Sequence, residues 1–332
     1  MLTRRIQPKI TIAGKEVTRD LAPYLLEINY EDVLSGEADT LEIMLWDSNR
    51  LFIGDYFPTL SDTLQVSLTK ENWQDNSNLD LGTFEIDEVQ AALPPSTFRI
   101  KAVSISQNSE LRQHDESKAW ENLKLSELAA QIAADSGVEL FYQASYDPDL
   151  KRVEQQEQSR LALLEKICAD NYLALKVDDG KLIIFDESEL DKQSPVATIE
   201  RDTSNILRFS AKKTLQEVYK GAQVSYKHGD KDELFEGKFE SGAENGKVLK
   251  INKRVENKGE AERLAKNELR QKNKRQAEIR LEVVGDFSLL AGNVVELKGF
   301  GKFDGNYIIE RARHKVGSGY ECSLELRQCL SY

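Results

Sequence analysis

The sequence has few of the residues on which metal sites and many enzymes depend. It contains three cysteines and three histidines in 332 residues, and Cys168, Cys322 and Cys329 form no CxxC motif. So few thiols and imidazoles leave little material for a zinc site. A sparse, odd set of cysteines is typical of a reducing compartment, where thiols stay unpaired. We therefore expect no metal ion and no cofactor.

Long apolar runs are also missing. No stretch approaches the roughly 18 apolar residues needed to cross a bilayer. The start, MLTRRIQPKI, has charges but no apolar core of a signal peptide. We expect a protein that is made and folded in a cytoplasm and has no membrane anchor of its own.

Positive charge is scarce relative to negative charge. The chain carries 45 Lys and Arg against 57 Asp and Glu, a formal net charge of −12. Stable binding of DNA or RNA depends on cations that neutralise phosphates, so we expect no tightly held nucleic acid. The most basic stretch, 247–275, interleaves its cations with glutamates and has no aromatic residue for base stacking. It is interpreted as a solvated helix face.

Catalytic motifs are absent from the sequence too. There is no P-loop, HExxH or GxSxG. Asp147 and Asp149, with Asp178 and Asp179, suggest the paired carboxylates of a glycoside hydrolase, which must face each other across a cleft. Because aspartate is common in turns for local reasons, we expect no catalytic residue. His314, on an alternating strand, is interpreted as a polar-face or interface residue.

What the sequence does contain is alternation of apolar and polar residues over residues 1–110. Leu41, Ile43 and Leu45 alternate with polar or larger neighbours, and DTLQVSLT, GTFEIDEVQ and STFRIKAVS repeat this period of two. Short strands with polar turns predict an antiparallel sheet or a small β-barrel. This region is the first predicted domain.

The pattern changes over residues 111–188, the second predicted domain. A helix is predicted over 125–137 with Ser126 as N-cap, and another over 159–172 with Ser159 as N-cap. Asp-Gly between two apolar runs predicts a hairpin around 173–185. The region is therefore expected to be a small α+β domain.

Residues 189–332, the third predicted domain, return to strands. One helix is expected over 258–275, because Asn257 and Glu260 resemble a capping box. The order of strands near the end matches that near the start, with Gly305 and Tyr307 in the places of Gly82 and Phe84. Any two β-meanders share some of this likeness, but we interpret it as a duplicated barrel.

The order of these segments resembles the late-control protein D family of phage tail proteins and the related N-terminal part of type VI secretion spike proteins. The resemblance is carried by AWENLKLSELAAQIAADSGVELFY, QQEQSRLALLEKICADNY, DDGKLIIFD, AGNVVELKGFGKFDGNYIIERARH and SGYECSLELR. No one of these segments is as specific as a metal motif. Their order and spacing, through most of residues 1–327, carry the likeness.

The resemblance implies a fold and a role. The fold class is mainly β with an α+β insertion: two similar small β-barrel domains flank the α+β domain, and three copies form a ring around a central channel. The chain would be a non-enzymatic baseplate hub of a contractile phage tail or tail-like injection particle, assembled in the bacterial host cytoplasm. It would join the sixfold tail tube to the threefold central spike.

The implied partners are the tail tube protein, a separate spike protein and the baseplate wedge proteins, while DNA passes through the channel without stable binding. The spike is expected to be separate because spike-fused family members continue past the equivalent of Tyr332. We expect subunit or partner interfaces on exposed sides of the repeated strands, at Gln65, Ser67, Glu296 and Lys298. Two alternatives stay open: a tail-associated cell-wall hydrolase, and a tail module that binds host-surface glycans.

Overall fold

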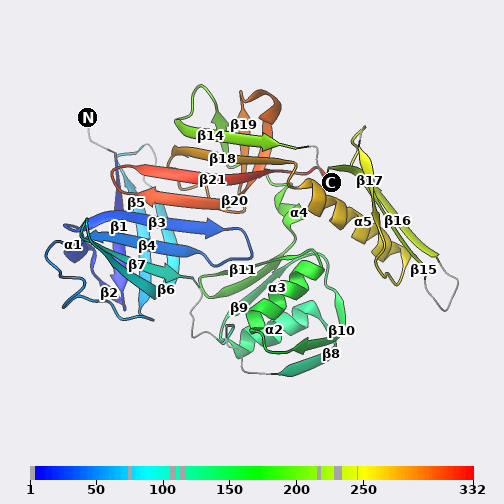
Figure 1. Ribbon diagram of the computed structural model, residues 1–332, viewed down its shortest axis with the longest axis horizontal. Coiled ribbons are helices and arrows are strands. Elements are labelled where there is room, and N and C mark those ends of the chain that lie inside the picture. The colour runs from blue at the N-terminus through cyan, green and yellow to red at the C-terminus, as the bar shows by residue number, and fades with distance from the viewer. Residues whose placement is uncertain are drawn as a thin grey trace. The chain divides into compact units, whose positions relative to one another are not determined.

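The protein is mainly β, with five α-helices among the described residues (Figure 1). The computed structural model describes residues 4–73, 77–104, 110–112, 117–214, 218–227, 234–244 and 246–332. These residues divide into two compact units, which are described separately. Unit 1 comprises residues 1–187, 282–292 and 310–324, and unit 2 comprises residues 188–281, 293–309 and 325–332.

Unit 1 begins with a β region that lies within residues 1–110. Its elements are β1 (Arg5–Ile12), β2 (Lys15–Glu16), α1 (Thr18–Leu21), β3 (Leu25–Val33), β4 (Thr40–Trp46), β5 (Thr63–Glu71), β6 (Asn78–Ala92) and β7 (Thr97–Val103). The strands follow the order β3-β4-β7-β6-β5-β1-β2, and residues 311–316 of β20 (Gly305–Val316) pair with β3. No pairing among the described strands closes this path into a barrel, so the two barrels stay a prediction.

The core of the first β region is formed by every second residue of its strands. Leu41, Ile43 and Leu45 of β4 are fully buried, as are the alternate residues of β5, while the residues between them face away. The predicted likeness between Gly82–Phe84 and Gly305–Tyr307 has a local counterpart. Both glycines have a positive φ, and both aromatic rings are buried.

The α+β region of unit 1 has its own core. Its elements are β8 (Lys118–Lys124), α2 (Leu125–Asp135), β9 (Glu139–Gln143), β10 (Asp149–Gln155), α3 (Arg160–Asp170), β11 (Ala174–Asp178) and β12 (Lys181–Phe185). Figure 1 shows α2 and α3 together against the sheet β11-β12-β9. Leu128 and Ile132 of α2 and Leu164 of α3 belong to one buried cluster with Leu182 and Ile184 of β12. The expected α+β character is confirmed.

Of the two N-caps predicted for the helices of this region, one is confirmed and the other is wrong. Ser159 is the N-cap of α3, and its hydroxyl accepts a hydrogen bond from the Ala162 N–H at 3.1 Å. The expected cap of the other helix, Ser126, is wrong, because α2 already begins at Leu125. The predicted hairpin is confirmed, and its turn residues Asp179 and Gly180 both have positive φ.

Unit 2 holds most of the remaining elements. They are α4 (Glu187–Leu190), whose first residue belongs to unit 1, β13 (Ala197–Glu200), β14 (Ile206–Lys213), β15 (Tyr219–Lys227), β16 (Leu234–Glu240), β17 (Lys247–Ile251), α5 (Lys258–Asn273), β18 (Ala277–Val284), β19 (Val294–Lys298), η1 (Gly301–Phe303) and β21 (Tyr320–Gln328). The strands β18, β20 and β21 each contribute residues to both units. β19 pairs with β13 and with residues 305–308 of β20.

A three-stranded sheet in the order β16-β15-β17 packs against α5. The predicted cap of α5 is confirmed, because the Asn257 side chain accepts a hydrogen bond from the Glu260 N–H at 2.9 Å. The helix ends at Asn273, two residues before the predicted end. Gly237 of β16 allows close packing, since a Cβ at this position would lie 2.2 Å from the Ala261 carbonyl carbon.

Candidate functional site

A polar surface of unit 1 covers one face of the sheet formed by β20, β3, β4, β7 and β6. We call it the charged face, and its side chains are Arg311, Arg313, Lys315, Glu27, Asn29, Glu31, Glu42, Met44, Arg99, Lys101, Glu88 and Gln90. These residues alternate with the buried residues of the same strands. The strand register aligns Lys315, Asn29, Glu42, Lys101 and Glu88 in one row across all five strands.

Each cation of the charged face has a carboxylate partner. Lys315 Nζ lies 2.7 Å from Glu27, Arg99 Nε lies 3.3 Å from Glu42, and Lys101 Nζ lies 3.9 Å from Glu88. Arg311 and Arg313 both bind Glu31, and Arg311 also lies 2.9 Å from Glu37 in the loop after β3. The face is therefore rich in charge but locally neutral.

The pairs hold their groups in the charged form. Partial burial alone raises the pKa of Glu27 and of Glu31, but hydrogen bonds from Lys315 and Asn29 to Glu27, and from Arg313 and Arg311 to Glu31, lower both pKa values below their ordinary range. The pKa of Lys315 is raised by its bond to Glu27. Half-exposed pairs of this kind are worth only about 0–1 kcal/mol each in stability. The pairs matter more for the charge of the surface than for stability, because every cation of the charged face has a carboxylate beside it.

This face was not singled out from the sequence, although a signal was present. Glu27, Asn29 and Glu31 alternate with buried residues of β3, and Arg311, Arg313 and Lys315 do the same on β20. The two strands are about 280 residues apart, so their pairing, and with it the match of acid to base, is a tertiary property.

Below the charged face, a buried polar cluster surrounds His314. The expectation that His314 is a polar-face residue is wrong: it is 1% exposed, its Nδ1 lies 2.7 Å from the Tyr320 hydroxyl, and its Nε2 lies 3.0 Å from the Leu289 carbonyl oxygen. Cys322 Sγ lies 3.3 Å from the same Nδ1. Burial lowers the pKa of His314 and raises the pKa of Cys322 to about 12, so both are neutral at pH 7. The cluster satisfies buried polar atoms and holds no reactive thiolate.

A second buried cluster joins the hairpin β11–β12 to β3 and the loop after it. Lys176 Nζ lies 2.5 Å from Asp32 Oδ1 and 3.2 Å from Asp39 Oδ2, and both carboxylates are buried. The Val33 and Ala291 N–H groups donate to Asp39 and Asp32 at 2.8 Å each. Burial and the neighbouring Asp32 raise the pKa of Asp39 to about 7, against the opposing effect of Lys176. One lysine thus compensates two buried acids.

Unit 2 contains a comparable anchor around Asp191. Its carboxylate lies 2.8 Å from Arg327 and 2.7 Å from Arg270, and the Asp191 side chain is fully buried. Arg270 and Asn273 of α5 also bind the carbonyl oxygen and the hydroxyl of Tyr332. The last residues of the chain are therefore bound by buried charge to α5 and to Asp191, the residue after α4.

The predicted interface residues of unit 1 lie together on β5. Gln65 is exposed and donates to the Thr83 hydroxyl at 2.9 Å, and Ser67 is half-buried. Both line an open, polar hollow of about 300 Å³, with Asp179 of the β11–β12 turn at its border. The Asp179 side chain accepts a hydrogen bond from the Thr83 N–H at 3.3 Å. Their role at an interface stays a prediction.

The predicted interface residues of unit 2 form a local pair on β19. Glu296 lies 3.0 Å from Lys298 and accepts a hydrogen bond from Thr198 of β13 at 3.0 Å. The bond from Lys298, followed by that from Thr198, lowers the pKa of Glu296. Both side chains are at least partly accessible, and their role in assembly also stays a prediction.

The carboxylates considered for glycoside hydrolysis have structural surroundings. Asp147 accepts hydrogen bonds from the Ser126 N–H at 3.0 Å and from its hydroxyl at 2.7 Å, so it caps the first turn of α2 from another segment. Asp149 is exposed on β10, and Asp179 binds Thr83. Among the described residues, no cluster of His, Cys, Asp or Glu has the arrangement of a metal site. None of the described helices has the length and apolar content to cross a membrane.

The fold resembles those of known tail proteins. A 43 kDa tail protein of prophage MuSo2 from Shewanella oneidensis aligns over 98% of both chains with a TM-score of 0.70 and 12% identity. The c3393 protein of E. coli, a component of the type VI secretion system, aligns over 98% of this chain and 76% of its own with a TM-score of 0.58 and 10% identity. The fold class is that of phage tail proteins and their type VI secretion counterparts.

Sequence comparison defines the family. The chain belongs to the YQBQ-like family, whose model matches residues 100–327. It is also 23% identical, over 210 residues, to the probable baseplate hub protein of Escherichia phage 186, a match that spans 60% of this chain and about half (51%) of that relative. The resemblance to phage hub proteins is confirmed: the chain is similar in sequence to a probable baseplate hub protein and has the fold of phage tail proteins.

Proposed function

We propose that this chain is the structural hub of a contractile-tail baseplate, and that three copies form a ring around a central channel. The ring joins the sixfold tail tube to the threefold central spike and contacts the baseplate wedge proteins. The β regions before and after the α+β region act as quasi-equivalent tube-like domains, so a trimer presents six of them. The three predicted domains, 1–110, 111–188 and 189–332, are the parts of this assembly.

The observation that carries the proposal is the charged face. In the assembled ring it lines the channel, which must let DNA or other cargo slide through. Binding of DNA gains its free energy from cations that replace the counterions of the phosphates. On the charged face Arg311 and Arg313 are already neutralised by Glu31 and Glu37, and Lys315 by Glu27. A hydrated surface with paired charges offers phosphates little to bind and apolar cargo little to stick to.

The proposed role is non-enzymatic and mechanical. The match to a probable baseplate hub protein supports it, as do the structural surroundings of Asp147 and Asp179. The protein would assemble in the bacterial host cytoplasm and become part of the virion tail or of a tail-like particle.

Light scattering of the purified chain, with negative-stain images of the same peak, tests the proposal. We expect a mass of about 113 kDa, three times the 37.7 kDa of the chain, and ring-shaped particles with a central hole. A monomer that stays monomeric when a spike protein of the same particle is co-expressed would refute the trimeric hub. Clearing of peptidoglycan in a zymogram would favour the hydrolase instead.

A further inference from the structure

The three-stranded sheet of unit 2 has two open edges. β16 ends it on one side and β17 on the other, and in the part of the chain that the structure describes neither has a second neighbour. Each edge strand also carries one exposed large apolar side chain, Leu234 on β16 (56% exposed) and Val248 on β17 (43% exposed). Open edges with apolar side chains readily accept a strand from another chain.

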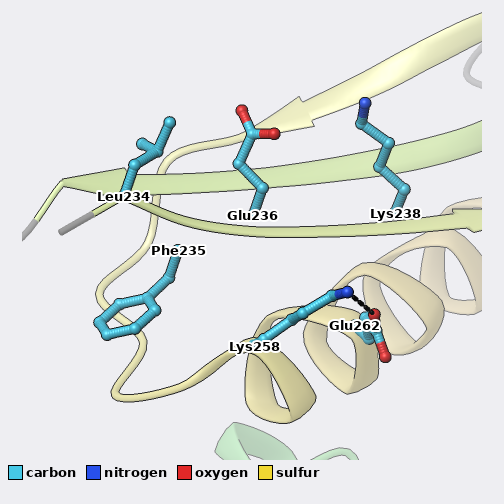
Figure 2. A pocket seen from close by; sticks show the side chains of 6 residues that line it. All are labelled: Leu234, Phe235, Glu236, Lys238, Lys258 and Glu262. Atoms are coloured by element: carbon cyan, nitrogen blue, oxygen red, sulfur yellow. Dashed lines mark ion pairs between the residues drawn. The ribbon is translucent and has the colours of Figure 1, made fainter.

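A hollow of about 450 Å³ follows the edge of β16. Figure 2 shows Leu234, Glu236 and Lys238 on one side of this strand, and Phe235 on the other side, near the start of α5. Lys258 and Glu262 of α5, which lie 3.7 Å apart, complete the lining. Because side chains from both faces of β16 line it, the hollow lies along the strand edge, where an added strand would run.

We infer that β16 of one copy pairs with β17 of a second copy, so that this sheet continues from subunit to subunit. The inference rests on the proposed trimer and names one of its joints. Within one chain β15 is antiparallel to β16 and parallel to β17, so β16 and β17 run in opposite directions. We place the axis of the proposed ring parallel to these strands. Rotation about such an axis preserves their direction, so the joint between copies is antiparallel.

Charge selects the register of this joint. Glu236 and Lys250 lie on the solvent face of their strands, and placing them opposite each other makes one ion pair per joint. The same register places the aliphatic stem of Lys238 against Val248. A shift of two residues that brings Lys238 opposite Lys250 would instead oppose two like charges.

The helix-facing side chains fit the same register. It sets Phe235, which lines the hollow, opposite Ile251 of the second copy. It also sets Gly237, which has no side chain, opposite Leu249 of the second copy. A shift of one residue would exchange the two faces of the added strand and expose its apolar side chains.

A joint between two different edges is heterologous, so it forms a closed ring only if the rotation between copies closes. Three such joints complete the proposed trimer. Any weakening of the joint therefore acts three times in each particle.

Charge exchange tests the ion pair. We expect Glu236→Lys or Lys250→Glu alone to raise the dissociation constant of the trimer about tenfold or more, because repulsion replaces attraction at each joint. The double variant E236K/K250E should restore the wild-type constant. Glu244→Lys, an exposed reversal in the loop between the two strands, is the matched control and should change nothing.

Disulfide trapping tests the geometry in a Cys329→Ser background, since Cys168 and Cys322 are buried. Within one sheet Glu236 and Lys250 are separated by β15, roughly 10 Å, which is too far for a disulfide. A bond in E236C/K250C must therefore link two copies. We expect dimer and trimer bands on a non-reducing gel, and none from the control pair E236C/E244C.

The outcomes separate the joint from the trimer. A wild-type trimer that gives no E236C/K250C bands, and whose dissociation is unchanged by both single reversals, overturns the joint and leaves the hub proposal standing. A chain that is monomeric with the spike protein and gives no bands overturns both. Bands together with rescue by the charge exchange support the joint.

Discussion

Replacement of Lys176 by methionine is the sharpest test of how the α+β region is held to the first β region. The substitution keeps most of the side-chain volume and removes the ammonium group that lies 2.5 Å from Asp32 and 3.2 Å from Asp39. Two buried carboxylates then have no cation between them. Removal of one partner from a buried ion pair costs about 3–5 kcal/mol, and we expect this loss in the free energy of unfolding at pH 8.

The loss should depend on pH in a defined direction. The pKa of Asp39 is raised from 3.8 to about 7 by burial and by Asp32, so the folded chain holds a proton that the unfolded chain releases. Stability from this group is therefore complete below about pH 4 and is lost as the pH rises through 7. Without Lys176 the folded pKa rises further, which extends the loss above pH 7. At pH 5 Asp39 is protonated in both variants, and we expect a smaller effect of roughly 2 kcal/mol.

Urea unfolding followed by tryptophan fluorescence measures this effect, because Trp46, Trp73 and Trp120 all belong to unit 1. Lys166→Met, an exposed change on α3, is the control and should shift the free energy of unfolding by less than about 0.5 kcal/mol. A loss below about 1 kcal/mol at pH 8, or an equal loss at pH 5 and pH 8, would refute the argument from buried charge.

Three further outcomes follow from the other buried groups. Asp191→Ala should cost about 3–5 kcal/mol and free the C-terminal residues to proteolysis, since two guanidinium groups lose their partner; an unchanged digestion pattern would contradict this. Asp147→Ala should cost about 1 kcal/mol through lost capping of α2, measured by thermal unfolding, with Asp149→Ala as the silent control. Burial lowers the pKa of His314, so stability from this group is lost as the pH falls below 6.5; an NMR titration midpoint at or above 6.5 would disprove it.

Local sequence signals predicted the helices and turns well where they act over a few residues. Ser159 and Asn257 cap their helices because a side-chain oxygen three residues away reaches a free N–H. The hairpin at Asp179-Gly180 also depends on local sequence, because these two residues readily adopt the positive φ angles of the turn. The prediction of Ser126 as an N-cap was wrong because the contact is not local: the Ser126 N–H donates to Asp147, which is 21 residues away.

Alternation in the sequence by itself determined that the chain is mainly β and which strand residues are buried, because a period of two separates the faces of any strand. It did not determine which strands are neighbours. The pairing of β20 with β3 brings Arg311 and Arg313 to Glu31, and the same pairing buries His314 beside Tyr30. These partners are hundreds of residues apart in the sequence and meet only through tertiary packing. The free energy of an ion pair or of a buried imidazole depends on the groups opposite it, and these groups are known only once the chain is folded.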